Sequence, residues 1–88
     1  MTKLEEKLIE LGYKPYEYFM LIHSFIKIYN DKWNVIIETG MDKTHVIECY
    51  VVLDGTAIYT QQDIDNLQQA FDEMQKDLEI LKGVEYAK

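Results

Sequence analysis

The side chains that could carry out catalysis in this chain are few: His23, Ser24, His45 and Cys49. Nucleophilic catalysis needs a serine or cysteine within hydrogen-bond reach of a histidine. His45 and Cys49 point the same way on a predicted strand, but their four-residue spacing separates them by about 13 Å, too far for a hydrogen bond or a shared metal ion. We therefore expect Cys49 to be a small core residue and the protein not to be an enzyme.

Metal and cofactor motifs are also absent from the sequence. Asp63, Asp65 and Asn66 resemble the start of a calcium-binding loop, but the glycine at its sixth position and the glutamate at its twelfth are missing. The chain contains no CxxC pair, no phosphate-binding glycine loop and no GxSxG sequence. We expect neither a metal ion nor a cofactor.

Three acidic residues form a first candidate site. Asp65, Asp72 and Glu79 repeat every seven residues, which places them on one outward stripe of a helix with about 10 Å between neighbours. Such a stripe is commonly a solvated face, with Asp72 and Lys76 as an ordinary ion pair. Alternatively, the three acids substitute for phosphates and bind a basic, nucleic-acid-binding protein.

Composition limits the partners. The 88 residues include nine basic residues, all lysine, against sixteen acidic ones, for a net charge of −7. This charge repels nucleic acid, and arginine, which recognises phosphates and guanine best, is missing, so no direct nucleic-acid binding is expected. Without a secretion signal, a membrane-length apolar run or a second cysteine, the sequence indicates a cytoplasmic protein with no membrane association.

Two helices are predicted at the ends of the chain. Leu4, Leu8 and Leu11 have helical spacing, so residues 3–11 are predicted to form a helix that Gly12 ends. A longer helix should run from about residue 61, after a Thr60 N-cap, to Gly83. Its apolar seam, predicted to pack on the chain's own sheet rather than in a coiled coil, is Ile64, Leu67, Phe71, Met74, Leu78 and Leu81.

The segments between the helices have the composition of β-strands: about 19–29, 33–39, 45–53 and 56–59. Short connections at Asp31-Lys32 and Asp54-Gly55 favour hairpins. The predicted fold is one α+β domain over residues 1–88, an antiparallel three- to four-stranded meander between an N-terminal and a long C-terminal helix (α-β-β-β-β-α). Whether residues 16–24 are helix or strand stays open.

Both faces of this sheet are apolar. The face predicted to meet the long helix contains Ile26 and Ile28, then Trp33, Val35 and Ile37, then Ile47, Cys49, Val51 and Leu53. The other face is a second candidate site, for a partner or for a homodimer: Phe25, Tyr29, Ile36 and Tyr50. The alternative is that the helix at 3–11 or the segment 16–22 covers it.

The chain resembles two known kinds of protein. The order of elements looks like the double-stranded RNA-binding domain, but Thr60 to Asp63 stand where that family has lysines. The stretches TQQDIDNLQQAFDEMQKDLEILKG and FIKIYND resemble small acidic proteins encoded by phages and prophages of Gram-positive bacteria. That resemblance implies a protein that binds a host or phage protein, as an inhibitor or a DNA mimic.

Three functions are thus compatible with the sequence. The first is a non-enzymatic interaction protein that binds a protein partner. The second is a structural or assembly protein that forms a homodimer through the aromatic sheet face. The third is a small enzyme or enzyme subunit.

Overall fold

The structure, a computed structural model, describes residues 1–19, 22–29, 33–53 and 60–87. The elements follow in the order α1 (Lys3–Glu10), β1 (Lys14–Phe19), β2 (Ile22–Ile28), β3 (Trp33–Gly40), β4 (Val46–Leu53) and α2 (Gln61–Lys82). The strands form one antiparallel sheet in the order β1-β2-β3-β4. The predicted α+β class and the order of one helix, four strands and a long helix are confirmed.

The first strand differs from the prediction. The segment predicted as one strand at 19–29 contributes to two strands, and β1 begins earlier, at Lys14, where a connection was expected. β1 pairs with β2 from Lys14 opposite Ile26 onwards, and Pro15 is tolerated because β1 is an edge strand. The predicted strand at 56–59 and both predicted hairpin turns lie outside the described residues.

Local signals define the ends of the helices: Thr60, Gly12 and Gly83 act as predicted, and Thr2 is an additional cap. The Thr2 hydroxyl accepts a hydrogen bond from the Glu5 N–H (3.1 Å), and the Thr60 hydroxyl accepts one from the Asp63 N–H (3.1 Å), so each helix begins with a capped turn. Gly12 follows α1 with a φ of 101°, a conformation that favours glycine. Gly83 is the C-cap of α2.

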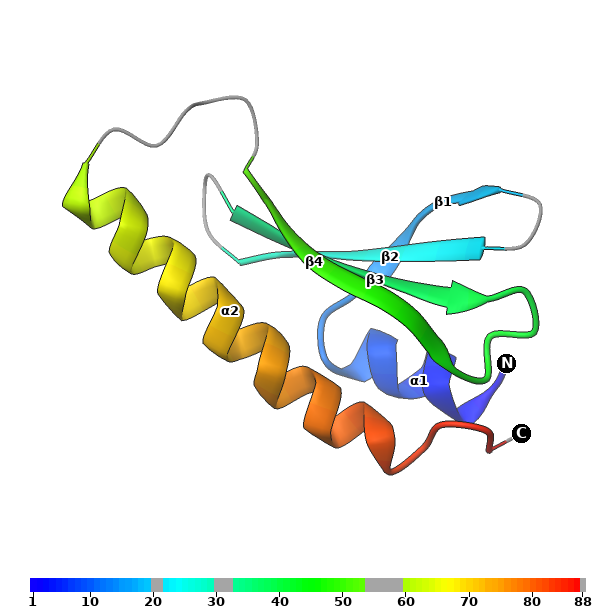
Figure 1. Cartoon of the computed structure of the whole chain (residues 1–88). Helices are drawn as coiled ribbons and strands as arrows, with labels where there is room; N and C mark the ends of the chain where they lie inside the picture. The colour runs from blue at the N-terminus through cyan, green and yellow to red at the C-terminus, as the bar shows by residue number, and fades with distance from the viewer. Residues whose placement is uncertain (20–21, 30–32, 54–59, 88) are drawn as a thin grey trace.

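Both helices lie on the same side of the sheet, and α2 runs obliquely beneath β3 and β4 (Figure 1). The hydrophobic core between helices and sheet contains Leu4, Leu8, Tyr13, Phe25, Val35, Ile37, Met74 and Leu81. We call the other side of the sheet the open face, because neither described helix covers it. The alternative that α1 covers this face is wrong, since α1 packs with α2 on the other side. Of the segment 16–22, the part up to Phe19 belongs to β1 and Ile22 begins β2, while residues 20 and 21 lie outside the described residues.

The buried side of α2 is rotated from the predicted seam. Met74 and Leu81 are buried as expected, but Ile64 and Phe71 are 48% and 40% exposed. Their places toward the sheet are taken by residues predicted to flank the seam: Asp63, Ala70 and Asp77. Asp77 is accepted there because it has hydrogen-bond donors on the sheet and on the connection after α1.

The orientation of β2 was also predicted wrongly. Phe25 pairs with Ile37 on the helix side and is 1% exposed, whereas Ile26 pairs with Ile36 on the open face. In the sequence FIKI both sets of alternating positions carry apolar residues, so alternation alone does not determine the side. Lys27 therefore points inward, where its ammonium meets acids of α2.

A β-bulge reverses one further prediction, on β4. Thr39 pairs with Val46 and Glu38 with Glu48, which leaves Ile47 as the extra residue. Val46 consequently packs on the core, and Ile47, predicted to lie there, is 51% exposed.

The rotation of α2 predicts a contrast between two neighbouring residues. Leu81→Ala should lower the free energy of unfolding by about 3 to 5 kcal/mol, because Leu81 is fully buried in the core. Ile80→Ala should cost less than about 1.5 kcal/mol, because Ile80 is 44% exposed. Urea denaturation measures both, and equal losses would contradict the observed rotation of the helix.

Candidate functional site

The candidate catalytic residues do not form a catalytic pair. The His45 ring stacks on Tyr86, with centroids 5.1 Å apart, and its Nδ1 lies 3.6 Å from Asp42. Cys49 pairs with Ile37 on the helix side, and its pKa is raised by burial and by the charge of Glu48, so it stays a thiol. Among the described residues, no group of three or more His, Cys, Asp or Glu side chains could hold a metal ion.

Four ionisable side chains do come together between sheet and helix, and we call them the inner polar cluster: Tyr13, Lys27, Glu73 and Asp77. The Asp77 carboxylate accepts hydrogen bonds from the Tyr13 hydroxyl (2.7 Å) and the Lys27 ammonium (2.6 Å). Lys27 also donates to Glu73 (3.1 Å) and lies 5.1 Å from the centre of the Tyr13 ring. Sequence reasoning missed this cluster because its members are far apart in the chain and Lys27 was assigned to the other face.

The inner polar cluster is suited to structure rather than to catalysis. Burial alone would lower the pKa of Lys27, but its hydrogen bonds to Asp77 and Glu73 raise that pKa above the usual value, so the amine stays protonated. Burial and the bond to Asp77 raise the pKa of Tyr13, so it stays a neutral donor. A protonated lysine is no nucleophile and a neutral phenol beside an accepting carboxylate is no base.

These pKa shifts predict that stability falls at alkaline pH. Tyrosine and lysine in the unfolded chain lose their protons near their ordinary pKa values of 10.0 and 10.5, whereas folded Tyr13 and Lys27 keep theirs to higher pH. The contribution of each is complete below those values and is lost as pH rises above them, at up to about 1.4 kcal/mol per pH unit for each group.

Tyr13→Phe should therefore flatten the decline in the free energy of unfolding between about pH 10 and pH 11.5, as measured by urea denaturation at several pH values. Tyr16→Phe is the matched control, because Tyr16 is 57% exposed. An identical pH dependence in wild type and Tyr13→Phe would contradict the assigned role of the Tyr13 hydroxyl.

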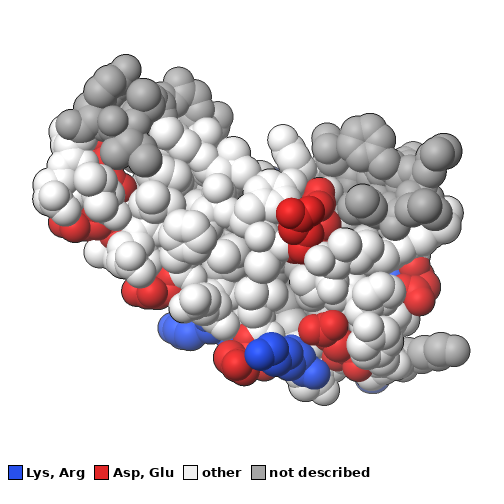
Figure 2. Space-filling view, in the orientation of Figure 1, with Lys and Arg blue, Asp and Glu red and all other residues white. Residues whose placement is uncertain are grey.

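The acidic stripe of α2 is satisfied within its own helix. Asp65 accepts from Gln61 (3.1 Å), Asp72 from Gln68 (3.3 Å) and Glu79 from Lys82 (3.1 Å). The predicted pair of Asp72 with Lys76 is not formed in the described chain, since the Lys76 ammonium lies 3.8 Å from Glu73 instead. Figure 2 shows acidic groups along this edge, with basic groups between them toward its lower end. A partner-binding role for the stripe stays a prediction.

The open face holds a shallow depression of about 760 Å³. Ile36 and Tyr50 lie on it as predicted, with Ile26 and Ile28 beside them, which had been assigned to the core. Phe25 is wrong as a member, because it lies on the helix side. Tyr29, the fourth predicted member, lies just after the end of β2 and is an even number of residues from Phe25, so strand alternation does not assign it to the open face. The apolar lining is Tyr16, Ile26, Ile28, Ile36, Tyr50 and Val52.

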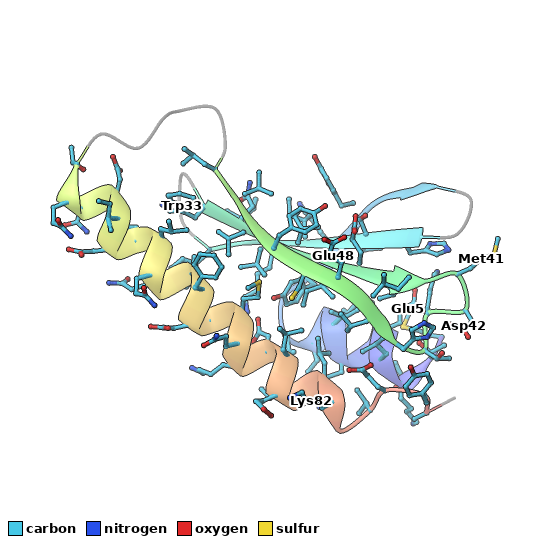
Figure 3. The ribbon with its side chains drawn as sticks, viewed as in Figure 1. Glu5, Trp33, Met41, Asp42, Glu48 and Lys82 are labelled. Carbon is cyan, nitrogen blue, oxygen red and sulfur yellow. The ribbon has the colours of Figure 1, made fainter. Side chains whose placement is uncertain are left out.

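Two glutamates stand side by side next to this depression. Glu38 of β3 pairs with Glu48 of β4, and Glu48 projects from β4 away from α2 (Figure 3). Glu38 accepts hydrogen bonds from Tyr50 (3.1 Å) and Ser24 (3.4 Å). In the part of the chain that the structure describes, no lysine forms an ion pair with either glutamate, and like charges directly opposite repel each other.

Comparisons of this chain with protein-family models, with curated proteins and with solved structures find no match. Neither described helix has the length and apolar composition needed to cross a membrane. The function is therefore argued from the geometry of the described surfaces.

Proposed function

We propose that this chain is a non-enzymatic interaction protein that binds a segment of another protein on its open face. The observation that supports the proposal most is an apolar depression that neither described helix covers, beside two glutamates to which no described lysine is paired. Ile28 is 63% exposed, and Tyr50 and Val52 are each 37% exposed. A contiguous apolar patch of this kind, rimmed by charge, is typical of a protein-binding surface.

The pairing of the strands indicates what the partner must present. Across the sheet, the open face has one apolar row centred on Ile36, with Ile26 and Tyr50 as its neighbours, and an acidic row centred on Glu38, with Glu48 as its neighbour. A segment with apolar side chains and one or two lysines or arginines at one end complements both rows. Its cation would relieve the repulsion between the glutamates, which favours specificity as well as affinity.

Other partners fit this surface less well. A second copy packed face to face would bring two more glutamates to the interface and only Lys14 from the depression to pair with them. The acidic stripe Asp65, Asp72 and Glu79 remains a predicted site for a basic partner, supported by its spacing alone. A phage or prophage origin and a cytoplasmic location likewise remain predictions.

Selection from a random peptide display library tests the proposal. The wild-type chain should enrich peptides that carry apolar residues next to Lys or Arg, and Ile28→Glu should weaken their binding at least about tenfold, because it puts a charge in the apolar lining of the depression. Ile9→Glu is the matched control, since Ile9 is 45% exposed on α1, away from the open face. Calorimetric titration gives the affinities, and circular dichroism confirms that each variant is folded.

A charge reversal sharpens this test. The double variant Glu38→Lys, Glu48→Lys should shift the enrichment from basic to acidic peptides while the apolar residues stay. The proposal would be wrong if the selected peptides bound Ile28→Glu as tightly as wild type, or if the reversal left their charge unchanged.

A further inference from the structure

We infer that two copies of this chain associate edge to edge through β4, with one side of α2 closing the interface. Their two four-stranded sheets would then continue as one antiparallel sheet. This contact uses a different surface from the open face and does not rest on the function proposed above.

The two edges of the sheet are protected to different degrees. β1 is six residues long, contains Lys14 and Pro15, and has a register shift between Pro15 and Glu17, all features that discourage pairing with another strand. β4 is eight residues long, VIECYVVL, and Glu48 is its only charged residue. In the described sheet no strand pairs with the outer side of β4. A long apolar edge of this kind recruits another strand.

The side of α2 next to this edge carries no acidic residue. Glu73 and Asp77 reach Lys27 on β2, so that side of the helix points toward the middle of the sheet and the opposite side must point past β4. At about 100° per residue, the residues of this α2 flank are Ile64, Gln68, Phe71, Gln75, Leu78 and, at the end of the helix, Lys82. Figure 2 looks onto this surface and shows it largely uncharged over α2 and β4.

Exposure on the α2 flank calls for a cover. Ile64 is 48% and Phe71 40% exposed, and both large apolar side chains lie on this one side of the helix. If β4 of a second copy pairs with this β4, the sheet extends above the flank. The α2 helix of that second copy then fills the space beside Phe71. The α2 flank and the β4 edge are therefore two parts of one interface.

The charges favour a second copy as the occupant. A twofold axis through Tyr50, perpendicular to the sheet, places Glu48 opposite Val52 of the copy rather than opposite another glutamate. The same axis makes the two α2 helices antiparallel, so Lys82, the one charged residue of each flank, lies at opposite ends of the interface and the two lysines stay apart. Although each chain carries a charge of −7, the flank has no acid, and the acidic stripe stays at the outside, where salt screens it.

Light scattering coupled to size exclusion, over a dilution series, tests this inference. The wild-type chain should be a dimer at high concentration, and Phe71→Glu should raise the dissociation constant at least about tenfold by placing an unpaired charge in the contact. Ile80→Glu is the matched control: Ile80 is 44% exposed on the opposite side of the same helix, so the dimer should persist. A monomeric wild type, or equal effects of the two variants, would overturn the inference.

Cysteine cross-linking identifies which surface is in contact. In a Cys49→Ala background, Tyr50→Cys should form a disulfide between copies on mild oxidation, because residues on a twofold axis between antiparallel strands have Cβ atoms about 5 Å apart. Ile28→Cys, which lies on β2 away from that edge, should not. Cross-linking through Ile28 and not through Tyr50 would place the contact on the open face and overturn the edge-to-edge arrangement.

Discussion

The orientation of α2 depends on one carboxylate held under the sheet. Asp77 is buried and accepts hydrogen bonds from Lys27 and Tyr13, which come from β2 and from the connection after α1. Turning the helix about its axis would break both bonds and leave a buried charge without a partner, at a cost of several kcal/mol. The helix therefore accepts a less apolar buried side and leaves Ile64 and Phe71 at its flank.

The same interaction determines the two faces of the sheet. Because Lys27 must point toward Asp77 and Glu73, strand alternation turns Phe25 inward and Ile26 and Ile28 outward. Both exposed apolar surfaces, the open face and the α2 flank, thus follow from one inward lysine. Ile26, Ile28, Ile64 and Phe71 are left at the surface because the contact between Lys27 and Asp77, which orients β2 and α2, takes up the buried positions instead.

Local sequence signals were sufficient for the framework and insufficient for the faces. Thr60 and Gly83 define the long helix, since capping depends on residues within one turn. The rotation of α2 could not be predicted, because it depends on a contact between Lys27 and Asp77, fifty positions apart. On the candidate site, Ile36 and Tyr50 were placed correctly and Phe25 was not. The apolar residues of β2 occur at both odd and even positions, so only the contacts of Lys27 identify the side that faces the helices.

The two surfaces are compatible with each other in one assembly. A twofold axis perpendicular to the sheet leaves both open faces uncovered and turns them to the same side, so a dimer would present two apolar depressions, each beside its own Glu38 and Glu48. A partner with two basic-apolar segments could then bind both copies at once, and the second contact would be intramolecular, which raises the overall affinity without any new contact. Because α2 lies on the other side of the sheet (Figure 1), its acids add no negative charge to the two open faces.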